Sequence, residues 1–291
     1  MKNLINYILI CVGLMLTTSC EKEITVDIPT SQSRLVVEAS INQRFPNLNY
    51  VYLSRTVDYF NPDLSLNGVK DALVYITPGV VFGGDTIWND SAKIQLIDVS
   101  SIPGIDVLLQ GFSGIYFNPL LTPQVGVPYK LEITAGTEKI LGFTSIPNVV
   151  EIDTLFWRTE ISENKKDTDL FVTFEFMDGP EQNNYRLGIQ NGFNTFLVGW
   201  GAASQFRTFD DAFLNNGVFP YSFFRPFNVG DTLSLYLTSI GRQEYLFWES
   251  FNKAANNGGP FATPISVKSN VTGAIGSFTG YAVGYKSVII K

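Results

Sequence analysis

The side chains that most often carry out chemistry in proteins are scarce in this chain. It contains no histidine, which removes the commonest general base and the commonest transition-metal ligand. The serines lie in no Gly-x-Ser-x-Gly turn, and a serine nucleophile without histidine lacks the base of the usual triad. Glycine pairs such as Gly83-Gly84 lack the lysine and the strand-to-helix context of a phosphate-binding loop. We therefore expect no cofactor, no transition metal and no enzyme activity.

Two pairs of acidic residues are the remaining candidates for catalysis. Asp210-Asp211, or Asp167 with Asp169, could supply the two carboxylates of a glycosidase or ligands for calcium. Neighbouring residues in a strand point to opposite faces of the sheet, and neither pair begins a calcium-loop pattern. A hydrolase remains one alternative, and it requires turnover that is lost when Asp210 or Asp211 is changed.

The N-terminus has the pattern of a secretory leader that ends in a lipid-modified cysteine. Lys2 precedes a mainly apolar stretch of 13 residues, Leu4 to Leu16, which is too short for a transmembrane helix, since that needs about 20. Small residues then lead into Cys20, which resembles a lipobox cysteine, although Thr17 stands where leucine is usual. Several acyl chains such as palmitate on Cys20 would anchor the protein stably, since each buried methylene contributes about 0.8 kcal/mol. The alternative is an ordinary cleavable signal with an incidental Cys20.

These features divide the N-terminal segment into two parts. We expect residues 1–19 to be the lipoprotein signal peptide and residues 20–33 to be a polar lipid tether. The acidic residues just after Cys20, Glu21 and Glu23, resemble a signal that sends some lipoproteins to the cell surface. The expected location is therefore a bacterial envelope membrane, with surface exposure as a possibility that the sequence leaves open.

The composition indicates a folded, acidic chain. Hydrophobic residues make up 45% of 291 residues and aromatic residues 14%, so the chain can bury a core rich in strand-forming side chains. The formal net charge of −7 repels phosphate backbones, so we expect no nucleic-acid partner. Both cysteines, Cys11 and Cys20, lie in or next to the leader, so packing and not disulfides must stabilise the fold.

Most of the mature chain alternates apolar and polar residues with a period of two, as half-buried strands do. The clearest runs are 35–41, 50–53, 73–76, 129–134, 140–144, 170–176, 185–189 and 233–238. We expect a mainly β fold, with an immunoglobulin-like β-sandwich over residues 34–148 and a second antiparallel β-rich domain over residues 149–291. Residues 242–256 carry aromatic side chains at helical spacing and predict one helix.

The segment from residue 206 to 227 contains eight aromatic residues among turn-forming ones. It lacks a clean period of two and predicts a long loop, and long ordered loops in compact domains tend to be functional. Aromatic side chains with one exposed face anchor protein interfaces and stack on sugars. The candidate partner or ligand contacts are Phe206, Phe209, Phe213, Tyr221, Phe223 and Phe224. The alternative, which the sequence leaves equally open, is that these rings are core.

Short motifs follow one another in a characteristic order along the mature chain. They include Leu35-Val36-Val37-Glu38-Ala39, Thr144-Ser145-Ile146-Pro147, Gly259-Pro260-Phe261 and Gly273-Ala274-Ile275-Gly276-Ser277-Phe278. Their order resembles a Bacteroidota lipoprotein family catalogued as domain-of-unknown-function family 4249, with Ala274 where another glycine is expected. The resemblance implies an outer-membrane lipoprotein, often encoded beside a TonB-dependent receptor, with no assigned activity.

From these observations we expect a non-catalytic binding or accessory subunit of a TonB-dependent receptor complex, held in the membrane by its N-terminal acyl chains. The alternative from another class is a stand-alone surface adhesin or glycan-binding protein, which would bind a sugar without any receptor.

Overall fold

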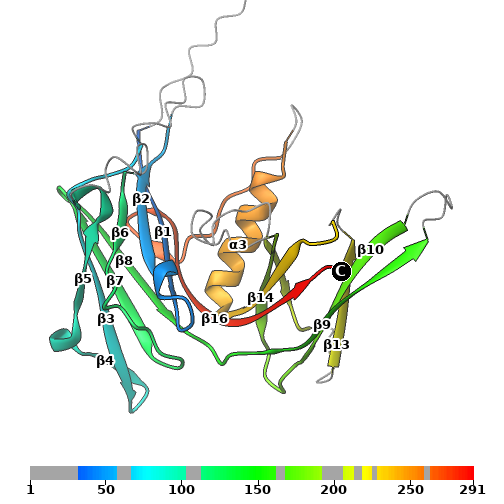
Figure 1. Cartoon of the computed structure of the whole chain (residues 1–291). Coiled ribbons are helices and arrows are strands. Elements are labelled where there is room, and N and C mark those ends of the chain that lie inside the picture. The colour runs from blue at the N-terminus through cyan, green and yellow to red at the C-terminus, as the bar shows by residue number, and fades with distance from the viewer. Residues whose placement is uncertain are drawn as a thin grey trace, which may run out of the picture. The chain divides into compact units, whose positions relative to one another are not determined.

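The structure, a computed structural model (Figure 1), describes residues 32–57, 67–102, 113–161, 168–191, 206–212, 218–224, 228–258 and 263–291. Ser33–Lys291 form one compact unit. Cys20, the signal peptide and nearly all of the tether lie outside the described residues, so the predictions on them stay predictions. Among the helices of the described part, none is both long and apolar enough to cross a membrane.

The first half of the unit consists of strands and three short 3-10 helices. They are β1 (Leu35–Asn42), η1 (Pro46–Leu48), β2 (Tyr50–Arg55), β3 (Leu73–Phe82), β4 (Asp85–Trp88), η2 (Asp90–Ala92), β5 (Ile94–Asp98), η3 (Val99–Ser101), β6 (Ile115–Phe117), β7 (Pro128–Ala135) and β8 (Glu138–Ser145). Alternate side chains of β7 are buried, as the period of two predicts. Glycines form the turns between β3 and β4 and between β7 and β8, where Gly83, Gly84 and Gly136 have positive φ angles of 61°, 91° and 61°.

The second half adds further strands and one α-helix. They are β9 (Ile152–Ile161), β10 (Thr168–Met177), β11 (Asn184–Asn191), β12 (Phe206–Asp210), β13 (Val218–Phe224), β14 (Thr232–Ile240), α3 (Arg242–Ala255), β15 (Val271–Thr272) and β16 (Ile275–Ile289). The prediction of a mainly β chain with one helix is therefore confirmed for the described residues. The immunoglobulin-like arrangement of residues 34–148 stays a prediction.

One large sheet runs through the unit. Its strand order is β12-β11-β14-β16-β1-β2-β6-β5-β3-β7-β8-β15, with β4 paired to β3, and β13-β10-β9 form a separate sheet. The long strand β16 connects the two halves, because its first part pairs in parallel with β1 and its second part pairs antiparallel with β14. Gly276 allows this close pairing, since it has φ 143° and a Cβ there would lie 1.8 Å from the carbonyl oxygen of Val37. The division at residue 148 stays a prediction, but β16 belongs to both sides of it.

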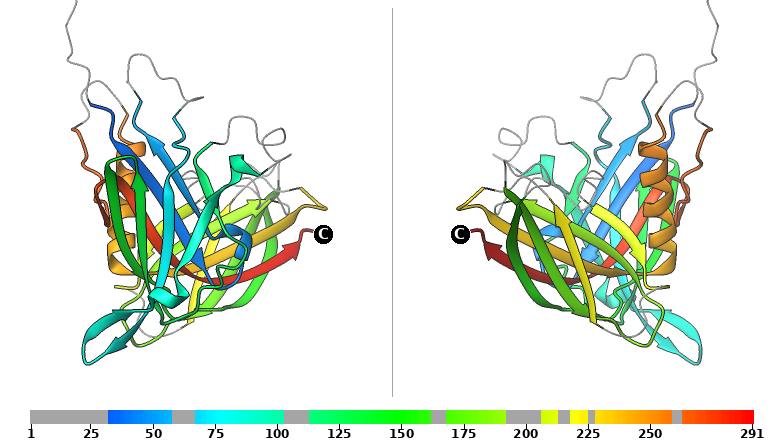
Figure 2. Two further views of the ribbon diagram at one scale, coloured as in Figure 1. Left: turned by 90° about the vertical axis from the view of Figure 1, so that its left-hand side faces the viewer. Right: turned by 90° about the vertical axis from the view of Figure 1, so that its right-hand side faces the viewer.

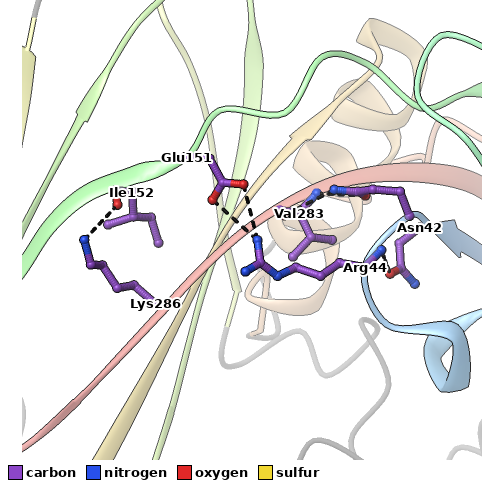
Figure 3. A network of polar contacts seen from close by, with 7 residues as sticks. Asn42, Arg44, Glu151, Ile152, Val283 and Lys286 are labelled. Atoms are coloured by element: carbon purple, nitrogen blue, oxygen red, sulfur yellow. Dashed lines mark hydrogen bonds and ion pairs between the residues drawn. The ribbon is translucent and has the colours of Figure 1, made fainter.

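A polar network also joins segments from the two halves (Figure 3). The side chain of Gln43 exchanges two hydrogen bonds with the backbone of Val283, at 3.2 and 3.3 Å. Arg44 forms an ion pair with Glu151 at 3.3 Å, and Lys286 donates a hydrogen bond to the carbonyl oxygen of Ile152. The ion pair is exposed and contributes little by itself. The two hydrogen bonds between the Gln43 side chain and the Val283 backbone are more important for the fold, because they hold the end of β1 against β16.

The helix α3 packs on the sheet beside β16 (Figure 1). Its buried side chains Tyr245, Phe247 and Trp248 form a cluster with Tyr281 and Val283 of β16, as the aromatic spacing predicts. In its first turn, Glu244 is buried and accepts a 2.7 Å hydrogen bond from the hydroxyl of Thr144 on β8. The helix is thereby attached to elements from both halves.

Candidate functional site

The carboxylates that the sequence suggested for catalysis have separate structural partners. An oxygen of Asp210 lies 3.5 Å from a guanidinium nitrogen of Arg242 in α3. Asp211 is buried, accepts a hydrogen bond from the backbone N–H of Asn183, and donates its own N–H to the Asn183 carbonyl. Asp167 lies outside the described residues, and of Asp169 only the backbone is described. Within the described ranges, no three Cys, Asp or Glu side chains come together as a group that could hold a metal ion.

The aromatic segment 206–227 is not one long loop, so that prediction is wrong. Residues 206–210 form β12 and residues 218–224 form β13. The period of two is present in β13 as Phe219, Tyr221 and Phe223, but Pro220 between them suggested a loop. Proline is compatible with an edge strand, and β13 is at the edge of its three-stranded sheet.

The candidate contacts in this segment differ in what the structure describes. Phe209 is half-buried and packs against Tyr185, with ring centroids 5.3 Å apart, so it is part of the core. Phe213 lies outside the described residues, and only the backbone of Phe206, Tyr221, Phe223 and Phe224 is described. A role of those residues in partner contact stays a prediction.

The sequence did not indicate a group of exposed apolar side chains that the described residues contain, on the hairpin formed by β3 and β4 (Figure 2). It extends beyond the neighbouring strands, because β7 pairs with β3 only as far as Pro78. Alternate residues of β3 show the consequence: Val74 and Ile76 are fully buried, whereas Val80 and Phe82 are 63% and 74% exposed. Ile87 lies opposite Val80 and is 60% exposed. We call Val80, Phe82 and Ile87 the apolar ribbon.

The opposite face of the same hairpin continues into the outer face of the sheet. Trp88 lies against the backbone of β3 at Gly79, where an added Cβ would come within 2.9 Å of the indole ring. The indole is half-buried and contacts Phe143 of β8 at a centroid distance of 5.5 Å. The ammonium group of Lys130 lies 5.6 Å from the Trp88 ring centroid. We call Tyr75, Trp88, Leu141 and Phe143 the aromatic face.

Charged side chains lie between the rings of the aromatic face. Glu132 accepts ion pairs from Lys93 at 3.0 Å and from Lys130 at 3.3 Å, and the Lys93 ammonium lies 4.4 Å from the Tyr75 ring centroid. Partial burial acts to raise the pKa of Glu132, but the hydrogen bonds from the two lysines outweigh it and hold the pKa below its ordinary value. Glu132 is therefore charged at neutral pH, and its two ion pairs hold it between Lys93 and Lys130.

A buried polar cluster lies between the sheet and α3. Arg186 of β11 is fully buried, its guanidinium lies 3.5 Å from the centroid of the Trp248 ring, and it donates a 3.1 Å hydrogen bond to the hydroxyl of Tyr281. Tyr50 of β2 donates a 2.6 Å hydrogen bond to Glu38 of β1. Desolvation lowers the pKa of Arg186, and the nearby Tyr281 and Glu38 oppose that effect. This cluster joins strands from both halves with the helix.

The described residues thus define a mainly β protein with an apolar ribbon and an aromatic face on the two sides of one hairpin. The chain belongs to the family defined by the domain of unknown function DUF4249, whose model matches residues 21–287. Among curated proteins, none matches the chain.

Proposed function

We propose that this protein is a lipid-anchored, non-catalytic subunit of the bacterial outer membrane that binds a partner protein, and that the partner is a TonB-dependent receptor. Cys20 at the end of a leader supports the anchor, and the resemblance of the motifs along the chain supports the receptor. The observation that carries the binding role is the apolar ribbon.

Exposure of the apolar ribbon to water is energetically unfavourable. A two-stranded hairpin without cover is marginally stable in water, and projecting strands are usually protected by charges or by a neighbouring element. Here three large apolar side chains continue the core face of β3 past the end of the core. Burying Phe82 and Ile87 against a partner would contribute about 1.5–3 kcal/mol each. A protein partner that covers them gains that free energy.

The anchor is tested by replacing Cys20. In the full chain, Cys20→Ala is expected to abolish labelling by a fatty-acid analogue and to release the protein into the soluble fraction, because the acyl chains provide the membrane affinity. The measurement is labelling followed by membrane fractionation. Unchanged labelling with the variant still in membranes would show that Cys20 is not the anchor.

The docking surface is tested by a polar variant of the apolar ribbon. We expect Phe82→Thr/Ile87→Thr to reduce capture of the receptor from gently solubilised outer membranes at least tenfold, because both side chains lose apolar contact. Threonine retains strand propensity, so the free energy of unfolding should change by no more than about 0.5 kcal/mol. Quantitative mass spectrometry of the captured proteins measures the effect.

The matched control is Val229→Thr, since Val229 is 78% exposed and lies outside the hairpin. It should capture the receptor like the wild-type protein. A Phe223→Ala/Phe224→Ala variant tests the other predicted contact in parallel. If the ribbon variant retains full capture, the ribbon is not the docking surface, and if the wild-type protein captures no envelope receptor, the proposed function fails.

A further inference from the structure

The outer face of the sheet formed by β5, β3, β7 and β8 is a second surface with its own chemistry. On one hairpin the two faces are distinct: Val80 and Ile87 lie on one side, and Gly79 and Trp88 lie on the other. The aromatic face is therefore accessible while the apolar ribbon is covered. We propose that the aromatic face binds an acidic polysaccharide, one whose sugar rings carry carboxylate groups.

Trp88 supplies a flat and fixed apolar surface. Its position is set by Gly79, whose missing side chain leaves room for the indole against the strand, and by contacts with Phe143 and Lys130. Phe143 is 50% exposed and Leu141 37% exposed beside it. The C–H groups on one face of a pyranose ring carry partial positive charge and pack on the electron-rich face of an aromatic ring. Because the rings are already in place, little conformational entropy is lost on binding.

The charge of this face is opposite to that of the protein as a whole. Lys93, Lys130 and Lys139 are the cations and Glu132 is the anion, which gives a local net charge of +2, whereas the chain carries −7. Lys139 belongs to this face because it pairs with Thr134, two residues beyond Glu132. An anionic ligand is attracted here and repelled elsewhere, and carboxylates form strong charge-assisted hydrogen bonds with lysine.

The position within the sheet favours a polysaccharide over an acidic peptide. Extended peptides are typically bound by adding a strand to a free sheet edge. Between residues 73 and 78, however, β3 is paired with β7 on one side and, at residues 74–76, with β5 on the other, and β7 is paired with β8. The backbone groups of β3 and β7 across the middle of this face are therefore in use, so recognition there must occur through side chains, which suits stacked sugar rings.

Titration calorimetry of the full mature protein with polygalacturonate tests the proposal. We expect binding that weakens with added salt, since exposed charges are screened, and a loss of affinity of at least tenfold in Trp88→Ala. Phe143→Ala, at a half-exposed position, should also weaken binding, and a thermal melt verifies that each variant is folded. Lys93→Gln is expected to weaken binding a few-fold. Dextran, a neutral polymer, and polyglutamate, an acidic peptide, should each bind at least tenfold more weakly than polygalacturonate.

The controls separate this site from the receptor-docking role. Phe82→Thr/Ile87→Thr should bind polygalacturonate like the wild-type protein, and Trp88→Ala should still capture the receptor. Equal affinity for polyglutamate would show that charge alone is recognised, and equal affinity for dextran would remove the requirement for carboxylates. Either result overturns the proposal, as does undetectable binding to polygalacturonate or unchanged affinity in folded Trp88→Ala and Phe143→Ala variants.

Discussion

Replacing Arg186 with alanine is expected to lower the free energy of unfolding by about 3–5 kcal/mol, the range for breaking a buried charged contact. Arg186 is fully buried, lies against Trp248 and donates a hydrogen bond to Tyr281. The substitution leaves a cavity between the sheet and α3. It also removes the positive charge that balances the negative charge of nearby Glu38. Urea denaturation followed by tryptophan fluorescence measures the change.

The matched control is Arg207→Ala. Arg207 lies opposite Leu187 on the neighbouring strand β12 and is exposed, so its replacement should change the free energy of unfolding by no more than about 0.5 kcal/mol. A loss of less than 1 kcal/mol in Arg186→Ala would contradict the structural role of the cluster.

Stability is expected to fall steeply above pH 10. Burial raises the pKa of Tyr281 to about 12, although Arg186 acts to lower it. Burial also raises the pKa of Tyr50 well above its ordinary value, and the Glu38 charge adds to this effect. In the unfolded chain tyrosine has a pKa of about 10. Between pH 10 and 12 the unfolded state therefore binds fewer protons than the folded state, and stability decreases as pH rises.

For Tyr281 alone the decrease is about 1.4 kcal/mol per pH unit in that range. Below pH 10 the tyrosine is neutral in both states, so its contribution is constant there. Urea denaturation at pH 8, 9, 10 and 11 measures the slope. Tyr281→Phe is expected to be less stable at pH 8, because Arg186 loses a hydrogen-bond acceptor, but to show a shallower decrease above pH 10. An identical slope in the variant would show that Tyr281 does not cause the decrease.

The sequence predicted those elements in which one face is buried and the other exposed. In β7 and β8 the alternation of apolar and polar residues matches the burial of their side chains, and Gly136 supplies the turn between them. The helix 242–256 was predicted to within one residue of its end, because one side of α3 packs on the sheet and the other is solvated.

Elements that are covered on both faces could not be predicted in this way. In β11, Tyr185, Arg186 and Leu187 are all buried, since one face meets the second sheet and the other meets α3. In the alternating run 185–189, Arg186 occupies a polar position, which gives no sign of the buried cluster. A charged residue at a polar position of an alternating strand looks exposed in the sequence. Its burial becomes evident only when the elements that pack against it are known.

The apolar ribbon was missed for a different reason. The sequence shows Gly83-Gly84 as a turn after a strand, but it does not show that β3 extends beyond the end of its neighbour β7. The length of the apolar run gave one usable signal, because Val80, Val81 and Phe82 are all apolar just before the turn. A strand that is apolar on both faces at its tip requires cover on both faces, and no local pattern tells whether that cover comes from the same chain.

The parallel pairing of β1 with β16 determines how early in synthesis the protein can complete its fold. The two strands are joined through residues as far apart as Gln43 and Val283, which are 240 positions apart. Closing so long a loop is entropically costly, and folds dominated by such distant contacts form slowly. The first strand also cannot complete its hydrogen bonds until nearly the last residues have been synthesised. The pairing that joins the two halves is therefore completed late in synthesis, and under the proposed function this delay suits a chain that must cross a membrane before it folds.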